Sequence, residues 1–181
     1  MSELLERPPR TIMEVYKMLP EGTLAELIDG IIYMSPAPFD NHQTVSMNLS
    51  IEMGSFIRER KLGKLFAAPF DVYLDEQSNA VQPDITVVLK ENKSIIRGHI
   101  HGAPDMIIEI LSRGSREYDS GKKKNLYERC GVKEYWIINP VSMESVGFVL
   151  AEGKYKEIAR LTNKIDSRLL QQEFRFDQRF E

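Results

Sequence analysis

The sequence at residues 103–112 reads APDMIIEILS, and the predicted fold is built around this segment. Its near-continuous apolar side chains predict a strand over residues 105–112 that is buried on both faces of a sheet. Glu109 interrupts the run on the face that also carries Ile107 and Leu111, so alternation does not carry its carboxylate to solvent. A buried ionised carboxylate costs several kcal/mol (order of magnitude) unless it is paired, protonated or bound to a cation. The sequence therefore implies a compensating positive charge beside Glu109.

A second carboxylate interrupts the neighbouring apolar run, VQPDITVVL at residues 81–89, where Asp84 follows Pro83. Two acidic groups on adjacent strands, together with a backbone carbonyl and waters, suit Mg²⁺ or Mn²⁺, which prefer oxygen ligands. Two simpler interpretations stay open. Glu109 could form an ion pair with a Lys or Arg, and Asp84 could be a turn residue that opens the strand.

The remaining elements follow from apolar periodicity and from turn residues. A helix capped by Thr11 runs to Met18, and the Asp29-Gly30 dipeptide between two apolar runs predicts a hairpin. The other expected elements are a helix at 41–60, a strand at 65–74 with a break at Pro69, a strand at 81–89, a helix at 115–130, strands at 135–139, 145–150 and 154–159, and an edge strand near 174–176. This order predicts an α/β fold with a mixed central sheet flanked by helices.

Composition narrows the class of protein. A chain of 181 residues with 42% apolar residues is expected to form one domain over 1–181, with residues 1–10 as a loose arm. The net charge of −3 excludes nucleic-acid binding by bulk electrostatics, so any phosphate contact must come from a local patch or a bound metal. The single Cys130 fits a reducing, cytoplasmic compartment, and no apolar run is long enough to predict a membrane span.

Two further groups of residues are candidates for chemistry. Lysines at 122–124 lie near the start of a predicted helix, where a positive charge interacts unfavourably with the helix dipole. Helix stability therefore does not explain their position, and a functional role is one explanation. His99 and His101 have the spacing of a metal pair on a strand. Because glycines flank them and no third ligand accompanies them, we interpret residues 98–102 as a loop without a metal.

Several strings in this sequence resemble the bacterial Uma-two family of endonucleases. They are Pro83-Asp84, the 103–112 stretch, the spacing Asp119–Lys123–Tyr127–Gly131, the GVKEYW string at 131–136, the ELIDG string at 26–30, and His42. The resemblance covers about residues 24–140, most of the chain. It implies a restriction-endonuclease-like fold of the PD-(D/E)XK superfamily, with an N-terminal helix and a β-hairpin beside the central sheet. It also implies metal-dependent hydrolysis of phosphodiester bonds in DNA.

The resemblance also implies roles for particular residues. Asp84 and Glu109 would ligate Mg²⁺ or Mn²⁺, and Lys123 would orient or activate the attacking water. Glu26 would reach the metal through water, His42 would contact phosphate or act as an acid, and Tyr127 would pack or hydrogen-bond near the site. In the superfamily a lysine usually stands two residues after the strand glutamate, but here Leu111 occupies that position and Lys123 is the match.

Two residues depart from the family pattern. Arg113 stands where proline is usual and could pair with Glu109 or with substrate phosphate, and Asn139 replaces an aspartate before Pro140. Alternative functions are a non-catalytic binding or scaffold protein that keeps the fold, and a hydrolase of a small phosphodiester. A homodimer matching the symmetry of duplex DNA is also expected, formed through the N-terminal arm and helix or through the tail strand.

Overall fold

The computed structural model describes residues 7–112 and 118–176. Its helical segments are α1 (Ile12–Lys17), α2 (Asp40–Glu59), the 3₁₀ segment η1 (Lys90–Ile95), the π-helical segment η2 (Tyr118–Lys123) and α3 (Lys124–Cys130). Its strands are β1 (Ala25–Ile28), β2 (Ile31–Met34), β3 (Gly63–Ala67), β4 (Val72–Tyr73), β5 (Ala80–Val81), β6 (Ile85–Leu89), β7 (Ile96–Arg97), β8 (His99–His101), β9 (Met106–Ile110), β10 (Glu134–Ile138), β11 (Glu144–Ala151), β12 (Lys154–Thr162), β13 (Lys164–Ser167) and β14 (Gln172–Arg175).

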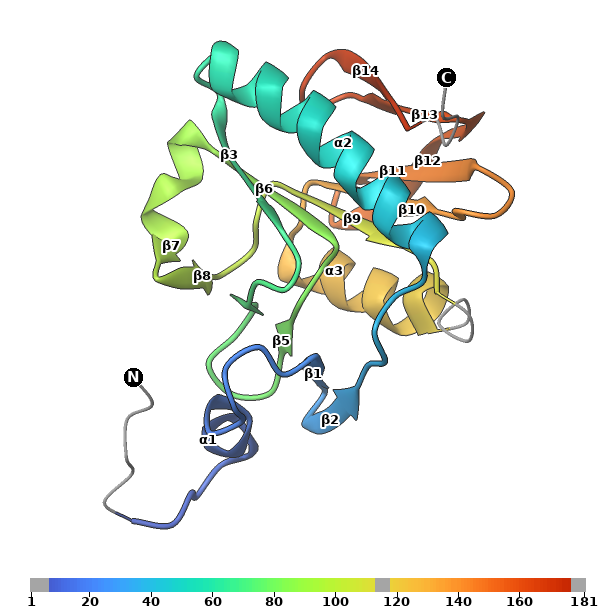
Figure 1. Cartoon of the computed structure of the whole chain (residues 1–181). Coiled ribbons are helices and arrows are strands. Elements are labelled where there is room, and N and C mark those ends of the chain that lie inside the picture. The colour runs from blue at the N-terminus through green and yellow to red at the C-terminus, as the bar shows by residue number, and fades with distance from the viewer. Residues whose placement is uncertain (1–6, 113–117, 177–181) are drawn as a thin grey trace.

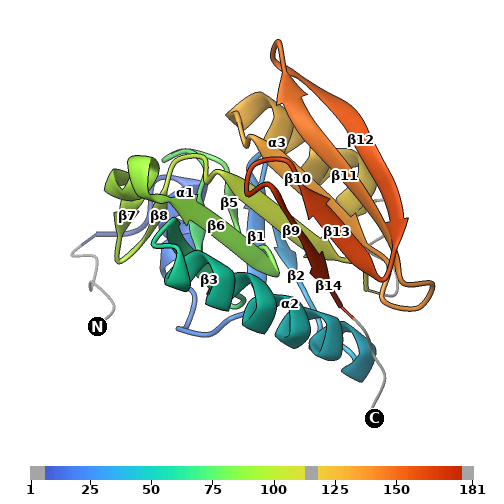
Figure 2. The ribbon, with the colours of Figure 1, turned by 90° about the horizontal axis from the view of Figure 1, so that it is seen from above.

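A mixed sheet in the order β12-β11-β10-β9-β6-β3 forms the centre of the fold (Figure 1). The β9–β10 pair is parallel and the other neighbouring pairs are antiparallel, as the sequence predicts for a mixed sheet. Helices α2 and α3 lie on opposite sides of this sheet (Figure 2). One core packs α2 and the β13–β14 hairpin against one face, and a second core packs α3 and a smaller sheet against the other. No helix of the described residues is long and apolar enough to cross a bilayer.

The smaller sheet has the order β2-β1-β5-β4-β8-β7; it confirms the break predicted at Pro69 and corrects the single strand predicted at 81–89. The expected strand at 65–74 is two strands, β3 in the central sheet and β4 in the smaller one. The expected strand at 81–89 is likewise divided into β5 and β6. Pro69 and Pro83 lie at the two crossings, and because proline has no N–H to donate to a ladder, the strands end there. Asp84 therefore stands just before β6, where the chain enters the central sheet.

The N-terminal elements confirm their predictions. The Thr11 hydroxyl caps α1 by accepting the Glu14 N–H at 3.1 Å. β1 and β2 form the predicted hairpin, and Asp29 and Gly30 at its turn have φ values of 50° and 77°. Of the expected arm, residues 1–6 lie outside the described part of the chain, and Arg7 forms an ion pair with Glu14. The long helix at 41–60 is α2.

Three other predictions need correction. The helix expected at 115–130 is η2 followed by a shorter α3, and residues 115–117 lie outside the described part of the chain. Residues 99–101 form strand β8 and not a loop; the His101 Nδ1 atom lies 3.0 Å from a Glu76 carboxylate oxygen. The single edge strand expected near 174–176 is part of the β13–β14 hairpin, which packs apolar residues against α2 and the central sheet. Alternation sends the many charged residues of this tail outward, and therefore they do not prevent its burial.

A glycine in β11 makes close packing around the only tryptophan possible. Gly147 lies opposite Trp136 of β10, and a Cβ atom on Gly147 would come within 2.5 Å of the buried indole ring. We expect Gly147→Ala to lower the free energy of unfolding by about 1–3 kcal/mol, because an overpacked core must shift. The matched control is Gly54→Ala in α2, where a Cβ meets nothing within 4 Å. It should raise stability by about 0.5–1 kcal/mol, since alanine favours a helix over glycine. Urea denaturation followed by circular dichroism measures both; equal effects would contradict this view of the core.

Candidate functional site

Glu109 of β9 is almost fully buried and lies beside a lysine. Its Oε1 atom is 3.0 Å from the Lys123 ammonium, and it accepts a 2.6 Å hydrogen bond from the Tyr127 hydroxyl. The positive charge that the sequence requires beside Glu109 is thus supplied by Lys123, which confirms the ion-pair interpretation for this structure. Lys123 is the last residue of η2, immediately before α3. π-Helical segments are rare and are frequent at functional sites.

Lys123 also binds a second carboxylate, from the N-terminal hairpin. Its Nζ atom lies 2.9 Å from Oε1 of Glu26 in β1, and the same oxygen accepts the backbone N–H of Gln82 at 3.0 Å. Side-chain exposures of 9% for Glu26, 7% for Lys123 and 5% for Glu109 show that all three charges lie out of bulk water. The ammonium therefore joins the smaller sheet to the central sheet.

Asp84 lies next to Glu109 because of the strand register. In the antiparallel β6–β9 pair Ile85 stands opposite Ile108, which places the preceding residue, Asp84, beside Glu109. One Asp84 oxygen accepts the Ile110 N–H at 2.7 Å, and the other lies 3.2 Å from Nε2 of His42 on α2. The turn interpretation of Asp84 is thus partly right, since Asp84 precedes the strand, but its carboxylate bonds across to the neighbouring strand. His42 contacts Asp84.

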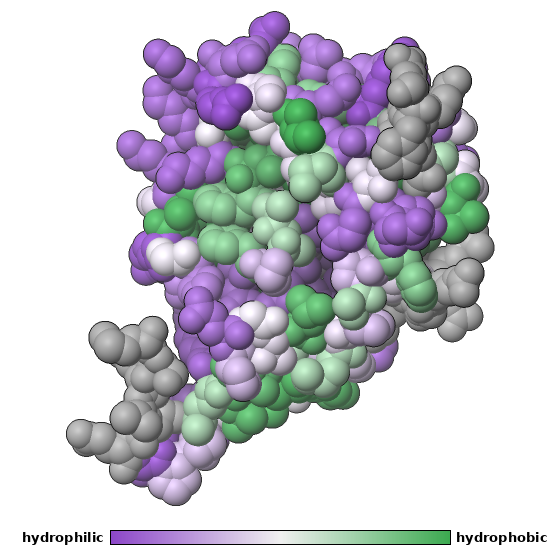
Figure 3. Space-filling model, viewed as in Figure 1, coloured by the Kyte–Doolittle hydropathy of each residue, from purple (hydrophilic) through white to green (hydrophobic). Residues whose placement is uncertain are grey.

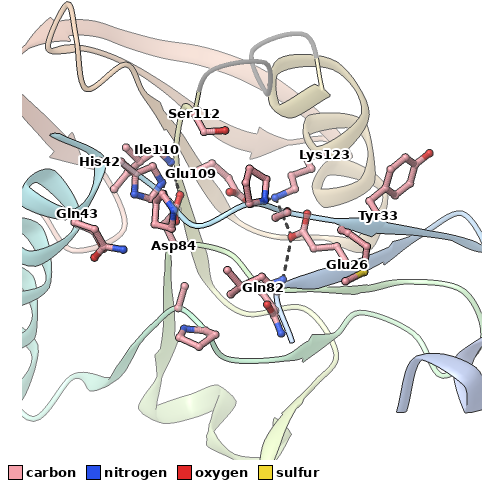
Figure 4. A pocket seen from close by; sticks show the side chains of 18 residues that line it. Glu26, Tyr33, His42, Gln43, Gln82, Asp84, Glu109, Ile110, Ser112 and Lys123 are labelled. Atoms are coloured by element: carbon pink, nitrogen blue, oxygen red, sulfur yellow. Dashed lines mark hydrogen bonds and ion pairs between the residues drawn. The ribbon is translucent and has the colours of Figure 1, made fainter. Parts of the chain in front are cut away.

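Five of the six predicted site residues line one cavity of about 450 Å³: Glu26, His42, Asp84, Glu109 and Lys123. Figure 4 shows their side chains converging from the hairpin, α2, the two central strands and η2. The sixth, Tyr127, is fully buried behind Glu109 and does not line the cavity. The prediction that Tyr127 packs and hydrogen-bonds near the site agrees with this geometry.

Burial decides the chemistry that is open to Tyr127. Loss of solvent, and then the negative charges of Glu109 and Glu26, raise the pKa of its hydroxyl well above the usual value of 10. Because ionisation is disfavoured, this group stays protonated at neutral pH. Tyr127 can therefore donate a hydrogen bond to Glu109 but cannot act as a base there.

Residues that the sequence analysis did not single out hold the site in place. Gln82 fixes Glu26 with its backbone N–H, and the Gln82 side chain donates to Asp71 at 2.9 Å. Asp71 also accepts the hydroxyl proton of Tyr16, and so α1 supports the same network. The position of Gln82 directly before the Pro83-Asp84 motif was the available signal. Gln43 and Ser46 of α2 line the cavity as well.

The departures from the family pattern have different outcomes. Asn139 closes a turn, because its side-chain oxygen accepts the N–H groups of Val141 and Ser142 at 2.9 and 3.1 Å. An aspartate would offer the same acceptor, so this change leaves the turn intact. Leu111 is half-buried and packs against the core that contains α3. Because its side chain carries no charge, it cannot supply the ammonium that a lysine at this position would supply. Arg113 lies outside the described residues, as does the side chain of Asp119.

The donor set agrees with a hard divalent cation that keeps waters. Among residues 7–112 and 118–176, no three His, Cys, Asp or Glu side chains converge to form a metal site by themselves. Asp84 and Glu109 nevertheless offer two neighbouring carboxylates at the wall of an open cavity. Mg²⁺ typically binds one or two carboxylates and retains several waters, so these residues fit Mg²⁺ or Mn²⁺.

Comparison with known proteins places the chain in a family. Residues 12–178 match the model of the Uma2 family, which is described as a putative restriction endonuclease. The chain belongs to the Uma2 family. The crystal structure of a putative nuclease of the DUF820 group from Anabaena variabilis shares this Uma2 fold, with a TM-score of 0.68 at 19% identity over 83% of this chain and 84% of that chain. No curated protein matches the sequence. The nuclease-like α/β fold that the sequence predicts for this Uma2 protein is confirmed.

The buried ammonium should dominate the stability of the site. We expect Lys123→Met to lower the free energy of unfolding by about 3–5 kcal/mol, because it leaves buried carboxylates without their cation. The double variant Lys123→Met/Glu109→Leu should recover part of that loss, since it removes one of the two buried carboxylates that Lys123→Met leaves unpaired, while Glu26 keeps its charge. Chemical denaturation of the two variants and the wild type measures the difference. A double variant as unstable as the sum of the single changes would show that the ion pair does not couple these residues.

Proposed function

We propose that this protein is a metal-dependent endonuclease that hydrolyses phosphodiester bonds in DNA. The observation that carries the proposal is the Lys123 ammonium held between Glu26 and Glu109, beside Asp84, at the wall of an open cavity. Membership of a restriction-endonuclease family supports a nuclease. Such a cavity brings one ammonium and three carboxylates to one place, which suits metal-dependent hydrolysis of a phosphodiester.

Each residue has a role in this proposal. Asp84 and Glu109 would hold Mg²⁺ or Mn²⁺, which supplies polarisation of a phosphate oxygen and a bound water of lowered pKa. The Lys123 ammonium orients the attacking water and offsets negative charge that develops on the phosphate. Glu26 fixes Lys123, and Gln82 fixes Glu26.

Two side chains act behind these groups. His42 holds the Asp84 carboxylate at 3.2 Å from the side of α2. The protonated Tyr127 hydroxyl holds Glu109 at 2.6 Å. Both carboxylates are therefore oriented before a metal or a substrate arrives, and this pre-organisation lowers the cost of binding either.

Cleavage of DNA tests the proposal. We expect Mn²⁺-dependent nicking of supercoiled plasmid or cutting of single-stranded DNA, and a loss of at least about a hundredfold in Asp84→Asn and Glu109→Gln, since each 1.36 kcal/mol of lost transition-state stabilisation is tenfold in rate. Asp166→Asn, which removes an exposed carboxylate of β13, is the matched control and should keep full activity. Cleavage that survives in Asp84→Asn contradicts the proposed roles. Hydrolysis of small phosphodiesters without DNA cleavage would assign the protein to that alternative class.

Metal binding has a readout that does not depend on activity. A ligand that binds only the folded protein stabilises it by about 2.7 kcal/mol at a hundredfold excess over its Kd. We expect Mn²⁺ to raise the Tm of the wild type and to leave that of Asp84→Ala unchanged. Equal shifts in both proteins would place the ion elsewhere, and no shift in the wild type would favour the non-catalytic scaffold.

The homodimer stays a prediction with one supporting observation. The N-terminal helix, one of the two places expected for the contact, exposes Ile12, Val15 and Met18 at 36%, 38% and 51%. Exposed apolar side chains that gather at one place on a surface are one mark of a protein–protein interface. Sedimentation equilibrium measures the molecular mass in solution. If α1 carries the contact, the wild type should have the mass of a dimer and Val15→Lys/Met18→Lys that of a monomer.

A further inference from the structure

A second cavity lies beside the candidate site, along the outer edge of the central sheet. It has a volume of about 870 Å³, and its walls are the C-terminal half of α2 on one side and η1 with β7 on the other. Between them lies β3, which is the last strand of the central sheet and pairs only with β6 among the described strands. We call this cavity the edge crevice.

The edge crevice and the candidate cavity lie along the same two walls, α2 on one side and β3 with the residues that follow it on the other. Gln43 and Ser46 of α2 line the candidate cavity, and Ser50 and Gly54 line the crevice at four-residue steps on the same side of the helix. The other wall is also continuous, because Lys64 and Leu65 of β3 line the crevice and Ala68 and Pro69 line the candidate cavity. At a rise of about 1.5 Å per residue, the path from Ser46 to Arg58 is about 18 Å long.

Positive charges surround this path. Arg58 of α2, Lys61 of the turn after α2 and Lys64 of β3 line one side, and Lys90 and Lys93 of η1 line the other. Within the described part of the chain none of the five forms an ion pair, and no Asp or Glu lines the crevice. Lysines elsewhere are engaged, as in the pairs Lys133–Asp105 and Lys164–Glu173. The crevice therefore gathers five exposed cations that form no ion pair with a carboxylate of the described residues.

The floor of the crevice restricts what can bind there. Its apolar residues are aliphatic, among them Ile51, Leu65 and Ile96, and no aromatic residue lines it. Figure 3 shows hydrophobic surface on the side of the molecule where β3 lies, bordered by hydrophilic residues. Without aromatic side chains the crevice offers no platform for stacking bases, so it is suited to a backbone rather than to base recognition. A second copy of the chain paired through β3 is disfavoured, because it would bring two sets of these cations together.

We propose that the edge crevice is a binding track for one strand of a nucleic acid, whose phosphates lie between Arg58, Lys61 and Lys64 on one wall and Lys90 and Lys93 on the other. This proposal rests on the proposed nuclease function, since the track leads the strand into the candidate cavity. It supplies the local basic patch that an acidic chain needs for phosphate contact. Continuity with that cavity favours a polyphosphate over an acidic protein segment.

Binding without cleavage tests the track. We would measure the fluorescence anisotropy of a labelled single strand of about 20 nucleotides in EDTA, over roughly 0.05–0.3 M KCl. The variants are Lys61→Gln/Lys64→Gln and Lys90→Gln/Lys93→Gln. The matched control is Lys154→Gln/Lys156→Gln, which removes two exposed lysines at the opposite edge of the sheet.

Log affinity falls as log salt rises, and each phosphate contact to a single strand adds about 0.7 to the steepness of that fall. Each crevice variant removes two lysines, so its plot should be less steep than that of the wild type by about 1.4. At 0.1 M salt this corresponds to roughly 25-fold weaker binding, relative to a common value at 1 M. The control should bind as the wild type does. Crevice variants that match the control overturn the track. A second probe, labelled poly-glutamate, represents an acidic protein segment. If the crevice variants bind this peptide more weakly than the wild type but bind the strand as the wild type does, the track is overturned in favour of an acidic segment.

The same variants separate this proposal from the proposed function. Strand binding that depends on the crevice, in a protein that cleaves nothing with Mn²⁺, supports the track and overturns the nuclease activity. Mn²⁺-dependent cleavage with strand binding that is insensitive to the crevice lysines supports the nuclease and overturns the track.

Discussion

The bifurcated ion pair from Lys123 to Glu26 and Glu109 is the interaction on which the site depends. Its three members come from the hairpin, the central sheet and η2, which are far apart in sequence. Each carboxylate alone in this position would be expensive, and the shared ammonium makes both tolerable. With their usual charges, two carboxylates and one ammonium leave a negative balance, to which Asp84 adds. This balance is the reason why a divalent cation is proposed at the cavity beside it.

The path of the chain between the two sheets places the other half of the site. The segments around Pro69 and Pro83 cross together from one sheet to the other, and the Ala68 N–H still bonds to the Asp84 carbonyl at 3.0 Å. Because the strand begins only at Ile85, Asp84 is free of the ladder on its side-chain face and reaches the Ile110 N–H and His42. A longer strand would have fixed Asp84 within the pleat. The missing N–H group of Pro83 ends the strand pairing before Asp84 and thereby allows the Asp84 side chain to reach its partners.

Local sequence patterns predicted whether a segment forms a helix, a strand or a turn better than they predicted which strands pair in a sheet. The Asp29-Gly30 turn, the long helix α2 and the buried strand around Glu109 depend on adjacent residues, and each is confirmed. The break at Pro69 follows from the proline itself, but membership of one sheet or another depends on residues far away, so periodicity did not predict that β3 and β4, or β5 and β6, belong to different sheets. The tail was misjudged because its overall charge hides an alternating apolar face.

The candidate site follows the same division. The cost of burying Glu109 predicted a nearby cation from one strand alone, and the resemblance to a family supplied Lys123 as its source. Support from Asp71 was not predictable, because it arises where two sheets meet and Asp71 interrupts no pattern; for Gln82 the one signal was its position before Pro83-Asp84. Charge distribution gives a related lesson. Like charges within a Debye length of about 8 Å repel and weaken a fold, and a chain of net charge −3 has carboxylates enough to pair them. The crevice cations line one cavity without such partners, so ion pairing within the described residues does not explain their position.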